Sequence, residues 1–299
     1  MNTSHQIKSL DNKIISLEKI GIIYNTEHKQ AIEVVDKLEN IFKEYGHSCI
    51  KRQITPGKGK KVEDFDKDIS FAIVVGGDGT FLGAARFYAP LDIPLFGINI
   101  GRLGFLSQLQ LEELEQGIKK LIDGQFKVEE RLMLKSFNVS KESRFSYTAL
   151  NDVVIKGGSI SRTAQLFLYI NGKHVCDYVA DGLIISTPTG STAYTLSAGG
   201  PVVVPELEAI VIVPICPHAL TSRPIVIPAN EEIMVSVKSD SDIVYLTADG
   251  QESVKLRSSD NIYVKQTEYK AKLILLEKEN NGFYRVLREK LHWGVAPGS

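Results

Sequence analysis

Cysteine is scarce in this sequence: only Cys49, Cys176 and Cys216 are present, and they lie far apart. An odd number of scattered cysteines argues against a disulfide framework, and the absence of a CxxC pair argues against a zinc site. This usage is typical of a reducing compartment, so we expect a cytoplasmic protein. No cysteine lies in a reactive turn and no Ser-His-acid set is apparent, which argues against nucleophilic catalysis.

Long apolar runs and an excess of one charge are missing as well. No run approaches the roughly 20 apolar residues of a membrane span, and residues 1–20 are polar, without the apolar core of a signal peptide. The 35 basic and 36 acidic side chains give a net charge of −1, so no basic field attracts nucleic acid or anionic lipid. We therefore predict small-molecule partners, with no nucleic acid and no membrane.

The composition is that of an ordinary globular protein. The 299 residues are 43% hydrophobic and 24% charged, and the length favours two domains. Residues 1–127 alternate strand-like apolar runs, such as 69–75, with amphipathic stretches of helical spacing, such as 27–46. This alternation predicts an N-terminal α/β domain with a Rossmann-like parallel sheet.

The helical periodicity ends near residue 128. Residues 128–269 contain short β-branched and aromatic runs separated by Gly, Pro, Asn or Asp, which predict a C-terminal β-sandwich-like domain. Residues 270–299 return to a strand followed by a helix. We expect this last segment to pack back on the N-terminal domain.

A glycine turn, GGDGT, directly follows the apolar run 69–75. Ligands of open α/β sheets bind beyond the carboxyl ends of strands, and glycines let backbone N–H groups at a helix start approach phosphate closely. A carboxylate beside phosphate is useful if it acts on a hydroxyl or on Mg²⁺. The alternative is a plain strand-to-helix turn in which Asp78 caps the helix. The predicted phosphate-binding residues are Gly76, Gly77, Gly79 and Thr80.

Three further stretches combine turn residues with polar side chains. The hydroxyl-rich run DGLIISTPTGSTAYTLSAGGP (181–201) could bind a nucleotide beside Tyr194, or could be a capped loop. Asn151 and Asp152 precede a β-branched strand, where the pair could bracket two vicinal hydroxyls or simply form a turn. Asp249, in TADGQE, could belong to the same site or to a hairpin turn.

Taken together, GGDGT, NIGRLGFL, LNDVVI, DGLIISTPTGSTAYTLSAGGP and PHALTSRPIVI occur in an order and spacing that resemble the NAD kinase family, over residues 19–294. GGDGT alone is less specific, because diacylglycerol-type lipid kinases and 6-phosphofructokinases have similar turns. The resemblance implies phosphorylation of the 2′-hydroxyl of the adenosine ribose of NAD by ATP with a divalent metal, of which Mg²⁺ is expected. It also implies a site between the two domains and a homo-oligomer, a dimer or tetramer.

The resemblance also implies roles for single residues. Asp78 would accept the proton, with the Gly79 backbone beside it, and Asn151 and Asp152 would hold ribose hydroxyls. Asp181 would meet the nicotinamide end across a subunit interface. No residue is expected to form a dedicated metal site. The other NAD-binding positions implied are Arg162, Thr192, Ala193, Tyr194, Thr195, Leu196, Ser197, Asp249 and Gln251.

Two positions depart from the family pattern. Asp152 stands where the family usually has Glu, and Val179 stands where it often has Arg, so Arg102 or Arg162 would carry more of the cationic contact. Two other functions compete with NAD kinase. A lipid kinase would need an apolar channel, which the polar turn at 187–197 argues against. A non-catalytic dinucleotide sensor would not need Asp78.

Overall fold

The computed structural model divides the chain into two compact units, Met1–Glu130 with Ala271–Ser299, and Arg131–Lys270. Their fold confirms the predicted combination of an α/β domain and a β domain. None of the helices in the described part of the chain combines the length and the apolar character needed to cross a bilayer. The structure describes residues 6–26, 29–54, 67–101, 104–107, 109–139, 145–158, 164–238, 244–277 and 282–292.

The first unit is built on a six-stranded sheet in the order β4-β3-β5-β6-β20-β7. The pairs β3–β4, β3–β5, β5–β6 and β6–β20 are parallel, as predicted for this region. Every residue of β5 is buried, because a central parallel strand is covered on both faces. The strands are β3 (Ile20–Tyr24), β4 (Cys49–Gln53), β5 (Phe71–Val75), β6 (Leu95–Ile98), β7 (Phe126–Arg131) and β20 (Ala271–Leu276).

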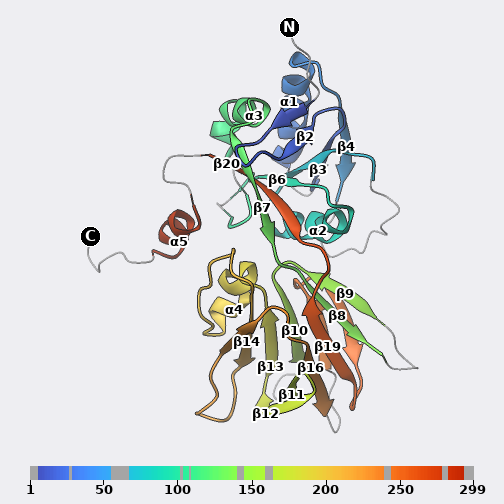
Figure 1. The fold of residues 1–299 in the computed structure, drawn as a ribbon, viewed down its shortest axis with the longest axis vertical. Helices are drawn as coiled ribbons and strands as arrows, with labels where there is room; N and C mark the ends of the chain where they lie inside the picture. Colours follow the sequence, from blue (N-terminus) through green and yellow to red (C-terminus); the bar gives the residue numbers. More distant parts are fainter. Residues whose placement is uncertain are drawn as a thin grey trace. The chain divides into compact units, whose positions relative to one another are not determined.

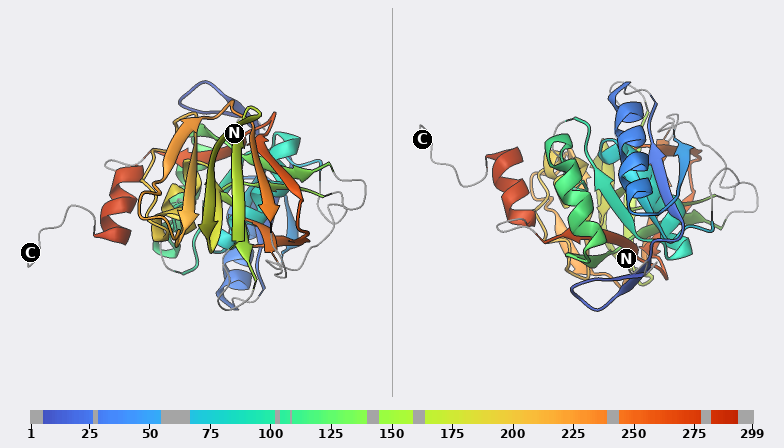
Figure 2. Two further views of the ribbon diagram at one scale, coloured as in Figure 1. Left: turned by 90° about the horizontal axis from the view of Figure 1, so that it is seen from below. Right: turned by 90° about the horizontal axis from the view of Figure 1, so that it is seen from above.

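Helices cover this sheet on both faces. Apolar residues of α1 (Lys29–Glu44) and α3 (Leu114–Ile122) join one cluster with Ile73 and Val75 of β5, and the two helices lie side by side over the sheet in Figure 2. On the opposite face, α2 (Asp78–Tyr88) packs against β5 and β6. The remaining elements of the unit are β1 (Gln6–Lys8), β2 (Ile14–Ser16), the 3₁₀ turns η2 (Ala89–Leu91) and η3 (Leu111–Glu113), and α5 (Phe283–Leu291).

The second unit contains two six-stranded sheets, ordered β15-β14-β13-β10-β17-β18 and β12-β11-β16-β19-β8-β9, in which all described pairs are antiparallel. Their strands are β8 (Leu134–Asn138), β9 (Ser146–Ala149), β10 (Asp152–Gly157), β11 (Ala164–Ile170), β12 (Lys173–Ala180), β13 (Gly182–Ser186), β14 (Ala209–Ile215), β15 (Ile225–Pro228), β16 (Ile233–Lys238), β17 (Val244–Ala248), β18 (Glu252–Leu256) and β19 (Asn261–Gln266).

The core of this unit lies between the two sheets. Val153, Ile155 and Leu246 from the first sheet share one buried cluster with Leu166 and Val235 from the second, which is the arrangement of a sandwich. The first sheet also buries residues on its other face, where Val154 and Ile184 pack with residues of β14 and with Val203. The segment containing η4 (Thr189–Thr192) and α4 (Tyr194–Ser197) follows β13 and lies beside these strands (Figure 1).

Candidate functional site

The glycine turn lies at the carboxyl end of β5, and α2 begins at Asp78 itself. The helix is capped by Gly77, and no side chain caps it, so the interpretation of Asp78 as a helix cap is wrong. Its carboxylate turns instead toward the loop after β6. Oδ2 accepts a hydrogen bond from the Phe105 N–H (3.2 Å), and Oδ1 accepts one from the Leu106 N–H (3.3 Å). Two backbone donors therefore fix the orientation of this carboxylate.

A side chain added at each glycine around Asp78 would meet different surroundings. A Cβ on Gly104 would collide with the Asp78 carboxylate, and a Cβ on Gly76 would lie 2.6 Å from the Thr80 Oγ1. Thr80 is itself buried, with 3% of its surface exposed, so it packs beneath the turn. A Cβ on Gly77 would meet nothing within 4 Å. No contact in the described chain requires glycine at position 77, and its missing side chain leaves space at the N-terminus of α2.

A lysine from the last helix, which no sequence motif indicates, joins this region. The Lys290 Nζ lies 3.8 Å from the Asp78 Oδ2 and 4.8 Å from the centre of the Phe105 ring. The two charged side chains are 35% and 33% exposed, so a ligand can still reach the carboxylate. Sequence alone could not pair two residues that are more than two hundred positions apart.

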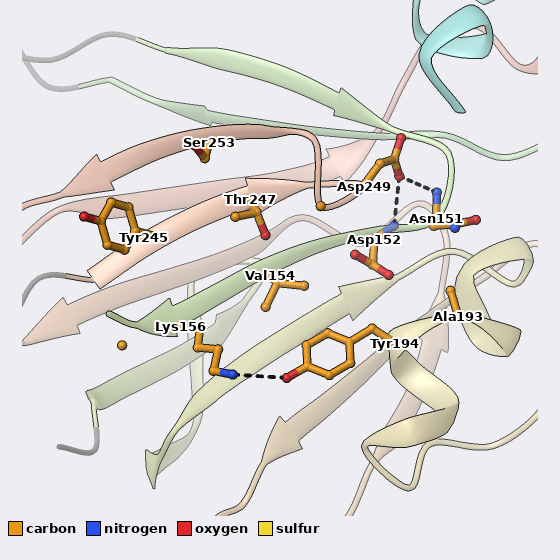
Figure 3. Close-up of a pocket in the computed structure, with 12 residues that line it drawn as sticks. Asn151, Asp152, Val154, Lys156, Ala193, Tyr194, Tyr245, Thr247, Asp249 and Ser253 are labelled. Atoms are coloured by element: carbon orange, nitrogen blue, oxygen red, sulfur yellow. Dashed lines mark hydrogen bonds between the residues drawn. The ribbon is translucent and has the colours of Figure 1, made fainter. Parts of the chain in front are cut away.

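In the second unit, a cavity of about 630 Å³ opens on the sheet face that is turned away from the sandwich core. Alternation along β10 explains its floor, because Asp152, Val154 and Lys156 line the cavity while Val153 and Ile155 enter the core. Figure 3 shows the lining side chains. They belong to Asn151, Asp152, Val154, Lys156, Gly157, Ala193, Tyr194, Tyr245, Thr247, Asp249, Gly250 and Ser253.

Asp249 forms one end of this cavity and fixes the backbone there. It and Gly250 have positive φ angles of 51° and 63° between β17 and β18, as in a type I′ hairpin turn, which confirms the turn interpretation. The Asp249 carboxylate accepts hydrogen bonds from the N–H groups of Leu150 (3.1 Å), Asn151 (2.8 Å) and Asp152 (3.3 Å). The turn therefore holds the Asn151–Asp152 pair at the cavity wall (Figure 3).

Asp152 is 4% exposed and faces this cavity. Burial, and then the negative charge of Asp249, raise the pKa of its carboxyl to about 7. No group in the described part of the chain donates a hydrogen bond to its side chain. A carboxylate in this position gains from a ligand hydroxyl that donates to it, because a buried charge without a donor is costly.

The hydroxyls of the run at 186–191 are used inside the protein, which corrects their interpretation as free ligand donors. The Thr187 hydroxyl donates to the Leu150 carbonyl (2.6 Å), and the Ser186 hydroxyl lies 3.2 Å from the Asn151 carbonyl oxygen. The Ser191 hydroxyl donates to the Val203 carbonyl and accepts from the Val203 N–H. These hydrogen bonds therefore connect the run at 186–191 to Leu150 and Asn151 and to Val203, beyond α4.

The other predicted NAD-binding residues occupy different places. Ala193 and Tyr194 line the cavity, whereas Thr195 is fully buried. Thr192, Leu196, Ser197 and Gln251 are partly or fully exposed but outside the cavity lining. Asp181 lies between β12 and β13, near the far end of β10, where its carbonyl accepts from the Gly157 N–H. Arg102 and Arg162 lie outside the described residues.

Seven cavity residues were not predicted: Val154, Lys156, Gly157, Tyr245, Thr247, Gly250 and Ser253. Val154 and Lys156 could have been found, because they follow Asp152 at the i+2 and i+4 positions of one strand face. The β17 and β18 residues depend on β17 pairing with β10, which the sequence does not reveal. The Lys156 Nζ lies 3.4 Å from the Tyr194 hydroxyl and 5.9 Å from the centre of that ring.

Comparison with known proteins assigns the family. The profile of the ATP-NAD kinase N-terminal domain matches residues 36–126, and that of the C-terminal domain matches residues 150–276. The NAD kinase of Moorella thermoacetica is 41% identical over 93% of this chain and 90% of its own length. The chain belongs to the NAD kinase family. The NAD kinase of Aquifex aeolicus is 39% identical over 91% of this chain and 98% of its own length.

Solved structures of the same family have the same fold. A yeast NADH kinase in complex with NADH superposes with a TM-score of 0.78 at 25% identity, over 94% of this chain and 89% of that one. An NAD kinase from Archaeoglobus fulgidus in complex with ATP superposes with a TM-score of 0.72 at 27% identity, over 92% of this chain and 98% of that one. One protein of this fold was therefore solved with NADH bound and another with ATP bound.

Proposed function

We propose that this protein is an NAD kinase that transfers the γ-phosphate of ATP to the 2′-hydroxyl of the adenosine ribose of NAD, forming NADP. Membership of the NAD kinase family supports the reaction. The observation that carries the site assignment is the cavity corner at which Asp249 holds Asn151 and Asp152 by their backbone N–H groups.

The cavity corner suits a ribose. The Asn151 side chain offers a donor and an acceptor, and the Asp152 carboxylate accepts from a hydroxyl. Ala193 and Tyr194 supply an apolar and aromatic wall for a base on the same side of the cavity. Asp152 is one methylene shorter than the Glu common in the family, and its buried place on the cavity floor supports direct contact with a ribose hydroxyl.

Asp78 is the proposed proton acceptor. Two backbone N–H groups orient its carboxylate, and one third of the side chain remains exposed to a ligand. In the proposed step, Asp78 takes the proton of the 2′-hydroxyl as the hydroxyl oxygen bonds to the γ-phosphorus and the bond to the β-phosphate oxygen breaks. A base positioned in this way contributes roughly 10²–10⁴-fold to the rate.

The N-terminus of α2 is the proposed site for donor phosphate. The open space at Gly77, at the positive end of the helix dipole, suits an anion, and the Gly79 backbone lies beside it. Gly76 and Thr80 pack against each other and shape the turn. Lys290 supplies a positive charge within 4 Å of Asp78, which offsets charge where phosphate and carboxylate meet.

The residues present fit a Mg²⁺ ion that arrives with ATP. Mg²⁺ is commonly held by one or two carboxylates together with phosphate oxygens and water, and Asp78 is the carboxylate available at the turn. No group of three or more His, Cys, Asp or Glu side chains in the described ranges forms a dedicated metal site. When bound, the ion neutralises charge on the β- and γ-phosphates.

We also propose a cytoplasmic homo-oligomer. The three cysteines are unpaired, which suits a reducing compartment. Asp181 would complete the nicotinamide end of a neighbouring subunit's site, as the family resemblance implies, and a symmetric interface repeats such a contact in every subunit. Sedimentation at assay concentration is expected to show an active dimer or tetramer, and a fully active monomer would contradict this proposal.

The reaction is tested by incubating the protein with NAD, ATP and Mg²⁺ and measuring NADP with an NADP-specific dehydrogenase. NADP is expected to accumulate in proportion to enzyme. A panel of other triphosphates, polyphosphate and NADH as alternative substrates defines donor and acceptor preference. Phosphorylation of diacylglycerol instead of NAD would identify a lipid kinase, and saturable NAD binding without any turnover would identify a dinucleotide sensor.

A further inference from the structure

The cavity has opposite charges at its two ends. Asp152, Val154 and Lys156 lie on one face of β10, and the four residue steps from the first to the last span roughly 13 Å. Asp249 adds a second carboxylate at the Asp152 end, and Lys156 is the charged lining residue at the other end (Figure 3). The floor therefore runs from an acidic end that suits hydroxyls to a basic end that suits an anion.

Lys156 forms no ion pair with the residues that the structure describes. No carboxylate in the described part of the chain lies within 4 Å of its ammonium group. Its partner is the neutral Tyr194, whose hydroxyl is 3.4 Å away and whose ring centre is 5.9 Å away. These contacts hold the ammonium group at the cavity, and within the described ranges they occupy one of its three N–H donors.

We propose that Lys156, held by Tyr194, binds the pyrophosphate of the dinucleotide and thereby sets the direction in which NAD lies in the cavity. This inference rests on the proposed NAD kinase function. The two phosphates carry the negative charge of NAD, and the carboxylates of Asp152 and Asp249 repel them from the acidic end. Placing the adenosine ribose at Asn151 and Asp152 therefore directs the pyrophosphate toward Lys156, whose charge attracts it.

The test compares ligands with and without the pyrophosphate. NAD affinity is measured by calorimetry, and inhibition by ADP-ribose and by adenosine is measured against NAD. Lys156→Met is expected to weaken NAD and ADP-ribose by about 5–20-fold, as for a partly exposed charged hydrogen bond. Adenosine should change by less than twofold, since it carries no phosphate. Lys156→Arg is expected to retain NAD affinity, because the charge is kept.

Lys265 provides a matched control. It also lies over an aromatic ring, 5.6 Å from the centre of Phe137, but on the other sheet and outside the cavity. Lys265→Met makes the same charge change and is expected to leave NAD affinity unaltered. In Lys156→Met the KM for NAD should rise while kcat and the KM for ATP stay within twofold, and the melting temperature should match that of the wild type.

Two results would overturn this inference: unchanged NAD affinity in Lys156→Met, or a loss for adenosine as large as the loss for NAD. Either result leaves the proposed function intact as long as the wild-type protein still makes NADP. A wild-type protein that binds NAD but forms no NADP would instead remove the proposed function. In that case the ligand comparison still decides whether Lys156 contacts phosphate.

Discussion

Asp78 in the glycine turn and Asp152 in the cavity are the same residue type in different surroundings. Two backbone N–H groups and a lysine at 3.8 Å surround Asp78, which is one third exposed. Asp152 is buried beside a second carboxylate, Asp249, and its pKa rises to about 7. The first environment orients a carboxylate that a ligand can reach, whereas the second favours a side chain that binds a hydroxyl and titrates near neutral pH.

The largest effect is expected from removing the base. Asp78→Asn keeps the shape of the side chain and an acceptor oxygen for one of the two backbone N–H groups, but an amide cannot accept the hydroxyl proton. The kcat should fall by about two or more orders of magnitude, with the melting temperature within a few degrees of the wild type. Steady-state kinetics and calorimetry measure both. Near-normal turnover would remove Asp78 from the chemistry, and a collapsed fold would make it a structural turn residue.

The next largest effect is expected from Asp249, which supports the cavity corner. Asp249→Ala leaves the N–H groups of Leu150, Asn151 and Asp152 without their acceptor. We expect a loss of about 2–4 kcal/mol in the free energy of unfolding and a higher KM for NAD. Asp249→Asn keeps one acceptor oxygen and should lose less of the free energy of unfolding. Equal stability of Asp249→Ala and the wild type in urea would show that these bonds do not hold the loop.

Asp152 gives the cavity a pH dependence with a definite sign. Its pKa is about 7 when folded and near its ordinary value of 3.8 when unfolded, so the folded state binds the extra proton between these values. Stability of the ligand-free protein should therefore fall as pH rises from about 4 to about 7, and Asp152→Asn should remove this fall. Urea unfolding at pH 5 and pH 8 tests it: the gain in stability of Asp152→Asn over the wild type should be clearly larger at pH 8 than at pH 5.

Substitution of Asp152 should also affect the KM values of the two substrates differently. Asp152→Ala is expected to raise the KM for NAD far more than the KM for ATP, because the lost acceptor faces the ribose. Asp152→Glu should be tolerated, since the family usually has that residue. Equal changes in both KM values would argue that Asp152 shapes the whole site instead of contacting NAD.

The smallest effect is expected at Lys290, whose contact with Asp78 is long and partly exposed. Lys290→Met should lower kcat by about fivefold, as for a partly exposed ion pair, with little change in the KM for NAD. Lys119→Met is the control, because Lys119 also pairs with an aspartate, Asp123, on the surface of the same unit. If both variants behave like the wild type, Lys290 has no part in the reaction.

The sequence predicts features that depend on neighbouring residues. The apolar run 69–75 and the glycines after it lie within one stretch of chain, so the strand, the turn and a helix after the turn were all predicted. The alternation of short strands after residue 128 likewise predicted a sandwich-like unit. The three-residue strands β1 and β2 were not predicted, because such short strands carry almost no periodic signal.

The rest depends on burial and on pairing between distant segments. The hydroxyls of Thr187 and Ser191 resemble ligand donors in sequence, but they are buried and bonded to the backbone. Tyr245 and Thr247 reach the cavity only because β17 pairs with β10. Lys290 reaches Asp78 only because the chain returns to the first unit. None of these three features produces a recognisable pattern within one short stretch of sequence.

The central claim is that the 2′-hydroxyl of the adenosine ribose accepts the phosphate. It is tested most directly with an NAD analogue that lacks only this hydroxyl and with ATP labelled at the γ-phosphate. The analogue should inhibit competitively against NAD, with an affinity lower by about 1–3 kcal/mol, and no label should appear on it. Label transferred to the analogue would show that another hydroxyl is the acceptor, and the assignment of Asp78 as its base would fall with it.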